Sequence, residues 1–165
     1  MQLTATCDPD EVRLITRVDT TQAAVADVDR TAGIHAALAE RGLLPSEHFV
    51  DAGYVDATPL VASRAEHGLD LVGPVRPDVG WQARQGEGDD VSTCAVDWAA
   101  RRVTRPQGQT GTARTPHADR RGNQAIRVKF PRRACRHCPQ HDHRTRAVSE
   151  PRHLTLRPGA EHDAL

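Results

Sequence analysis

Asp51 is the first residue whose position suggests catalytic chemistry. It follows the apolar pair Phe49-Val50 and precedes Ala52-Gly53-Tyr54. An aspartate just past the carboxyl end of a strand lies where α/β folds bind ligands, and Gly53 would let the backbone turn sharply there. Carboxylates at such positions can hold the two Mg²⁺ ions of phosphoryl transfer. The residues alone leave a second interpretation open, in which Asp51 caps the turn that follows it.

Cys135 and Cys138 form a second chemical candidate, because two residues separate them in a segment rich in arginine and proline. A Cys-x-x-Cys spacing is typical of one half of a structural zinc site. His141 or His143 could supply a third ligand. The fourth is not obvious, because Cys94 is about 40 residues away. The same spacing is compatible with two free thiols in a surface loop.

Arginine provides a third candidate, a cationic surface for nucleic acid. Between Arg101 and Arg157 there are 15 basic and three acidic residues. This segment is either a DNA-contacting surface or a solvated cationic loop. Aromatic residues are scarce, so we expect salt-sensitive phosphate contacts without sequence preference, and no base stacking. The candidates for phosphate contact are the adjacent pairs Arg101-Arg102, Arg120-Arg121 and Arg132-Arg133.

The composition limits what the 165-residue chain can be. Apolar residues make up 38% and aromatic residues 3%, which indicates that part of the chain is loop or lacks a partner segment. Residues 1–75 have a net charge of −7, and residues 76–165 a net charge of +7. Neither a signal peptide nor a membrane-span-length apolar run is recognisable. We therefore expect a cytoplasmic protein with reduced thiols, no membrane partner and no small-molecule substrate.

The elements that would position these residues alternate between strand and helix up to residue 76. This β-β-α-β-α-β order predicts an α/β sheet, with Thr58 capping the second helix. Beyond Pro77, glycine, proline and arginine rise and helical periodicity disappears, which indicates a separate loop-rich, β-containing module. The predicted strands are 2–6, 14–18, 48–50, 69–72, 95–98, 126–130 and 153–156, and the predicted helices are 25–41 and 59–67.

The run from Phe49 to Tyr54 resembles the block around the second catalytic aspartate of bacterial insertion-sequence transposases of the DDE class, whose core is ribonuclease-H-like. The surrounding segments 1–6, 14–16, 27–42 and 72–77 are similar to the neighbouring strands and helix of that family. Segments 105–108, 135–139 and 141–146 resemble the blocks of its inserted module, so the resemblance covers nearly the whole chain. It implies a partial ribonuclease-H-like sheet with helices in residues 1–76. An inserted arginine-rich module with the Cys-x-x-Cys would occupy residues 77–157, and a truncated tail residues 158–165.

The same resemblance implies what the chain has lost. In the family, Asp51 would bind Mg²⁺ together with an earlier aspartate and a later glutamate, which would lie upstream of Met1 and downstream of Leu165. One branch has cysteine in the inserted module where this chain has Arg105 and Arg144. We therefore expect no DNA cleavage, and weak or no zinc binding at Cys135, Cys138, His141 and His143.

The leading hypothesis is thus a truncated DDE transposase, inactive alone, whose full-length ancestor cleaved and transferred DNA strands in transposition. The alternative is a small nucleic-acid-binding protein that uses the arginine-rich module. A third hypothesis is a metal-dependent hydrolase built on Asp51, which is less well supported because Asp56 and Asp70 do not form an obvious set with it. Continuation of a transposase reading frame in the flanking DNA would distinguish the first hypothesis from the other two.

Overall fold

The chain folds into two compact units. The computed structural model describes residues 1–77, 81–85, 90–111, 113–119, 122–136, 138–139, 141 and 151–165. One unit comprises residues 1–76 with 163–165, and the other comprises residues 77–162. The division after Arg76 falls where the composition of the sequence changes. Among the described residues, no helix is both long enough and apolar enough to cross a membrane.

The first unit begins with a β-hairpin. Strand β1 (Gln2–Ala5) pairs in antiparallel fashion with β2 (Ile15–Asp19), so that Leu3 lies opposite Val18. The hydroxyl of Thr6 holds the base of the connecting loop, because it accepts a hydrogen bond from the Leu14 amide at 2.9 Å. The hairpin predicted from the sequence is therefore present, with the second strand shifted by one residue.

The predicted helix 25–41 is divided into two elements. A short 3-10 helix, η1 (Asp27–Arg30), leads directly into α1 (Thr31–Glu40). Helix α1 buries Ile34, His35 and Leu38. Gly42 ends it with a φ of 65°, a conformation that glycine adopts without a steric penalty.

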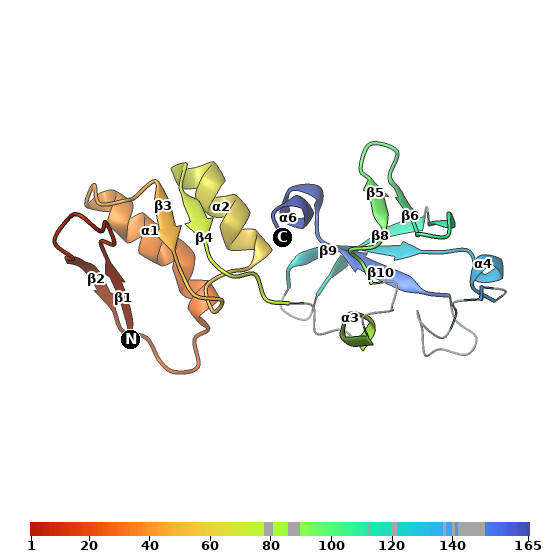
Figure 1. The fold of residues 1–165 in the computed structure, drawn as a ribbon, viewed down its shortest axis with the longest axis horizontal. Helices are drawn as coiled ribbons and strands as arrows, with labels where there is room; N and C mark the ends of the chain where they lie inside the picture. Colours follow the sequence, from red (N-terminus) through yellow and green to blue (C-terminus); the bar gives the residue numbers. More distant parts are fainter. Residues whose placement is uncertain are drawn as a thin grey trace. The chain divides into compact units, whose positions relative to one another are not determined.

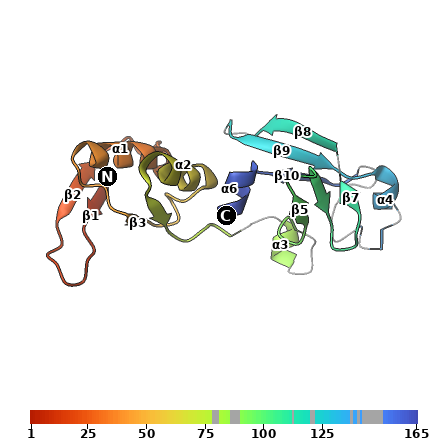
Figure 2. The ribbon, with the colours of Figure 1, turned by 90° about the horizontal axis from the view of Figure 1, so that it is seen from above.

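A β-α-β unit completes the first half. Strand β3 (Glu47–Phe49) pairs in parallel with β4 (Asp70–Val72), and α2 (Ala57–His67) connects them. Asp56 caps α2 by accepting a hydrogen bond from the Ala57 amide. The predicted cap at Thr58 is wrong, because an aspartate two positions earlier already offers a carboxylate to the first turn. Helices α1 and α2 lie on the same side of β3 and β4 (Figures 1 and 2).

The four strands of the first unit form two separate two-stranded sheets, β1-β2 and β3-β4. A groove of about 310 Å³ separates them; β1 and β3 form its walls, and Leu38 and Leu43 contribute to its lining. The expected α/β class is therefore present. A single continuous sheet is not, because neither pair reaches across the groove to hydrogen-bond with the other.

The second unit is richer in strands than its sequence predicted. One sheet has the order β5 (Ala95–Asp97), β6 (Arg102–Thr104) and β7 (Thr110–Gly111), all antiparallel. The other contains β8 (Ala113–Ala118), β9 (Gln124–Lys129) and β10 (His153–Leu156), with β9 in the centre. Strands β6, β7 and β8 were missed because Arg, Pro, His and Gly interrupt any alternation of apolar and polar residues.

Short helices accompany these sheets, and the described residues include α3 (Trp81–Gln85), α4 (Arg132–Arg136) and α6 (Gly159–Asp163). The expected tail at 158–165 thus contains a helix. The core of the unit joins the two sheets, because its buried side chains come from β6 of one sheet, from β9 and β10 of the other, from α4 and from the loops beside the strands. Its members are Cys94, Val103, Val128, Phe130, Cys135, Leu154 and Leu156.

Candidate metal and nucleic-acid sites

Asp51 lies two residues beyond the end of β3, in an exposed turn. Its Oδ1 atom accepts a hydrogen bond of 2.6 Å from the Gly53 amide, and its carbonyl oxygen accepts one from the Tyr54 amide. Arg76 closes the same loop by donating its Nε–H to the Ala52 carbonyl. The aspartate therefore caps its own turn, which is the second interpretation that the sequence left open.

Asp27, at the start of η1, is the carboxylate that sequence reasoning missed. A Cβ atom at Gly53 would lie 2.8 Å from Oδ1 of Asp51 and 3.2 Å from Oδ2 of Asp27, so both carboxylates border the same glycine. The buried side chain of Gln2 orients Asp27 by donating its Nε2–H at 2.9 Å. No spacing rule could have found this pair, because 24 positions separate the two residues in the chain.

The negative charges of Asp27 and Asp51 affect the pKa of Tyr54. Desolvation raises the pKa of Tyr54, and the negative charges of Asp27 and Asp51 raise it further. The other nearby acids are engaged elsewhere, because Asp56 caps α2 and Asp70 forms an ion pair with Arg64 at 3.2 Å. Among the described residues, no group of three acidic, cysteine or histidine side chains is arranged so that it could hold a metal ion. Two carboxylates do not fit the set that two-metal strand cleavage requires.

A buried arginine occupies the neighbourhood of the Cys-x-x-Cys. Arg105 is only 2% exposed, and its Nη2 atom donates to Cys135 Sγ at 3.7 Å. Its guanidinium also stacks on the Phe130 ring, 3.7 Å from the centroid. A tight turn from Arg105 to Gly108 brings it there, with Gly108 at a φ of 79°. A cation thus sits beside a sulfur that would otherwise be available to a metal.

The remaining zinc candidates do not complete a tetrahedron in the described residues. Cys135 and Cys138 are both buried, and a turn links them through the Cys138 amide and the Cys135 carbonyl. The His141 amide follows with a hydrogen bond to the Cys138 carbonyl. Cys94 belongs to the same buried cluster as Cys135, yet its thiol donates to the Asp90 carbonyl. His143 lies outside the described residues. This donor set, with Arg105 inside it, does not fit structural zinc.

The predicted phosphate-contacting arginines fall on separate elements. Arg101 and Arg102 lie at the β5–β6 turn and the start of β6, whereas Arg132 and Arg133 begin α4. All four are exposed. Arg120 and Arg121 lie outside the described residues. The residue that sequence reasoning missed is Arg114 on β8, whose guanidinium lies 5.1 Å from the centre of the Trp98 ring.

A third polar cluster lies inside the first unit. His35 Nε2 is 2.9 Å from His48 Nδ1, and the Ser63 hydroxyl is 3.1 Å from His35 Nδ1. A serine beside a histidine is the beginning of a nucleophilic triad. Here Ser63 is 4% exposed and His35 is fully buried, so no substrate reaches them. The array is therefore a structural hydrogen-bond network.

No protein-family model, curated protein or solved structure matches this chain.

Proposed function

We propose that this chain is a nucleic-acid-binding remnant of a DDE-type transposase, which acts in the cytoplasm and has lost strand cleavage. The observation that carries the binding function is the charge of the second unit. Arg101, Arg102 and Arg133 are exposed, and none of them forms an ion pair with another described residue. Exposed guanidiniums without carboxylate partners are available to phosphate groups.

The groove of the first unit supports the transposase origin. Strands β1 and β3 each pair on one edge only, and the groove lies between their free edges. Apolar side chains on these strand pairs are left in solvent: Leu3 is 56%, Ile15 64% and Phe49 59% exposed. Free strand edges with exposed apolar residues are typical of a sheet that lacks a strand. Such a strand, inserted between β1 and β3, would join the two pairs into one sheet.

The loss of cleavage follows from the carboxylates. Asp51 and Asp27 both border Gly53, but the described residues offer no third acid at that point. Two Mg²⁺ ions need more ligands than two carboxylates provide, because Mg²⁺ gives up its water shell reluctantly. Binding without cutting is therefore the activity that we propose for the present chain.

The experiment measures fluorescence anisotropy of a short labelled DNA duplex at several salt concentrations. We expect weak, sequence-independent binding that falls steeply with salt, with a slope of about 0.9 per phosphate contact. Arg102→Gln/Arg133→Gln should lower that slope by roughly 2. The control is Arg13→Gln/Arg41→Gln, which removes the same charge from exposed positions of the first unit.

If the control lowers the slope as much as the Arg102/Arg133 pair, only overall charge matters and the second unit is not the binding surface. Specific binding to one DNA site at physiological salt would also contradict the proposal. Retention of the slope by both double variants would show that Arg102 and Arg133 make no phosphate contacts, which contradicts the proposal.

A further inference from the structure

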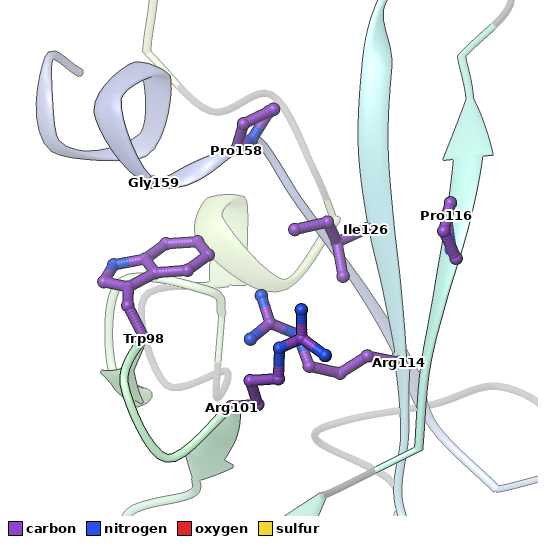
Figure 3. A pocket seen from close by; sticks show the side chains of 7 residues that line it. All are labelled: Trp98, Arg101, Arg114, Pro116, Ile126, Pro158 and Gly159. Atoms are coloured by element: carbon purple, nitrogen blue, oxygen red, sulfur yellow. The ribbon is translucent and has the colours of Figure 1, made fainter.

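A pocket of about 370 Å³ opens within the second unit, beside the β5–β6 turn. Its volume is in the range of small-ligand sites, about 300–1,000 Å³. Figure 3 shows the side chains of Arg101 and Arg114 extending into the space between Trp98 and Ile126. The described residues that line it are Trp98, Arg101, Arg114, Pro116, Ile126, Pro158 and Gly159.

The charge of this pocket is positive and uncompensated among the described residues. Neither Arg101 nor Arg114 forms an ion pair there, and no described acid lines the pocket. Two guanidiniums that share a pocket repel each other, and an anion between them would remove that repulsion. Guanidinium groups match phosphate particularly well, because their planar N–H donors form paired hydrogen bonds with its oxygens.

The other lining residues are flat and apolar. Trp98 is half-buried, with its ring edge-on to His162 at 5.4 Å between centroids. Gly159, at the start of α6, lies beside the indole: a Cβ there would be in ordinary van der Waals contact with Trp98 Cδ2, at 3.5 Å. Pro116, Pro158 and Ile126 add apolar surface. An indole beside cationic groups is a surface on which nucleic-acid bases stack.

The backbone conformation of Arg101 also supports a ligand site at this pocket. Its φ is 54°, and it is the only non-glycine residue with a positive φ in the described chain. The left-handed conformation costs an ordinary side chain roughly 1–2 kcal/mol. Glycine would close this β5–β6 turn without that cost. Strained residues concentrate where a side chain serves a ligand, and the Arg101 side chain lines the pocket.

We propose that this pocket binds a nucleotide, with the phosphate between Arg101 and Arg114 and the base against Trp98. This inference rests on the proposed DNA binding. It adds a site for one unpaired nucleotide to the contacts with duplex phosphates. The shared chemistry is a nucleoside monophosphate, which either a free nucleotide or the end of a DNA strand supplies. The scarcity of aromatic residues in the sequence predicted no base stacking; Trp98 and Arg114 become neighbours only in the folded chain.

The test uses tryptophan fluorescence of the full chain. Trp81→Phe leaves Trp98 as the only tryptophan. This protein is titrated with adenosine monophosphate, adenosine, inorganic phosphate and a short 5′-phosphorylated single strand. Adenosine monophosphate should quench the fluorescence, and adenosine or phosphate alone should bind at least about tenfold more weakly, because each lacks half of the contacts. The relative affinities of the nucleotide and the strand show which source the pocket prefers.

Three variants separate the pocket from general charge. Arg114→Gln should weaken binding of the monophosphate at least about tenfold. Arg101→Gly should weaken it equally while leaving the melting temperature unchanged or higher, since glycine relieves the backbone strain. Arg136→Gln, an exposed arginine of α4 that does not line the pocket, is the control and should bind normally.

The proposal is overturned if adenosine monophosphate does not quench Trp98, if phosphate alone binds equally well, or if Arg136→Gln weakens binding as much as Arg114→Gln. These outcomes are independent of duplex binding. Duplex anisotropy that persists without nucleotide binding would leave the DNA-binding function standing and remove the pocket. Nucleotide binding without duplex affinity would support the pocket and contradict the proposed duplex binding.

Discussion

The guanidinium of Arg105 donates a hydrogen bond to the thiol of Cys135 from inside the core of the second unit, with Nη2 3.7 Å from Sγ. The two residues come from different elements, the turn after β6 and helix α4. This contact places a permanent positive charge next to one of the two sulfurs of the Cys-x-x-Cys.

The first prediction is that the wild-type chain holds no stoichiometric zinc, because a fixed cation repels Zn²⁺. Arg105→Cys should create zinc binding by adding a third thiol and removing that charge. Elemental analysis after dialysis measures this, and Arg105→Cys/Cys138→Ser is the matched control that should lose the metal again. One tightly held zinc in the wild type, lost on Cys135→Ser, would contradict the prediction.

The second prediction is that the free energy of unfolding falls at acidic pH. Desolvation, with smaller effects from the charges of His48 and His67, lowers the pKa of His35 to about 4. In the unfolded chain the pKa of His35 is near 6.5. Between about pH 6.5 and pH 4, the unfolded chain therefore binds a proton on His35 that the folded chain does not bind. The stabilisation is therefore complete above about pH 6.5, is lost as the pH falls to about 4, and amounts to roughly 3 kcal/mol.

Urea unfolding of the wild type between pH 7.5 and pH 4 checks this. His35→Gln should flatten the pH dependence, whereas His153→Gln, at an exposed position on β10, should leave it unchanged. Burial also lowers the pKa of His48, so a smaller slope of the same sign should remain in His35→Gln. Identical profiles for wild type and His35→Gln would show that the buried histidine does not control acid stability.

The third prediction is that the protein does not cleave DNA. Supercoiled plasmid incubated with the protein and Mg²⁺ or Mn²⁺ should not be nicked, because Asp27 and Asp51 are joined by no third acid in the described part of the chain. Asp51→Ala should behave like the wild type and change the free energy of unfolding by no more than about 1 kcal/mol, since it loses one exposed hydrogen bond. Nicking in Mn²⁺ that Asp51→Ala abolishes would refute this.

The fourth prediction compares two glycines. A Cβ at Gly73 would lie 2.5 Å from the Val50 carbonyl oxygen and 2.8 Å from Val55 Cγ2, so Gly73→Ala must move the backbone beside β4. We expect it to lower the free energy of unfolding by roughly 1–3 kcal/mol.

Gly33, in the first turn of α1, has only ordinary contacts at 3.7 Å or more, so Gly33→Ala should raise the free energy of unfolding by roughly 0.5–1 kcal/mol. Urea unfolding of the two variants measures both effects. Equal effects of the two changes would show that the close approach at Gly73 does not affect the free energy of unfolding.

Local sequence determined the elements whose signals lie within a few residues of one another. The β1–β2 hairpin, the end of α1 near Gly42 and the strand before Asp51 were all found, because turn residues and apolar alternation act over short distances. The cap of α2 was placed two residues too late, since Asp56 and Thr58 are both good caps and the sequence does not rank them.

Only the tertiary structure decided which side chains meet. Asp27 joins Asp51, Arg114 joins Trp98 and Arg105 reaches Cys135 across 30 positions, and none of these pairs has a spacing that a helix or strand period would indicate. Strands β6, β7 and β8 likewise depend on pairing with neighbours distant in sequence, which outweighs their irregular composition. The sequence by itself thus determined residue chemistry and local turns, whereas the charges and rings were brought together by packing between elements distant in the chain.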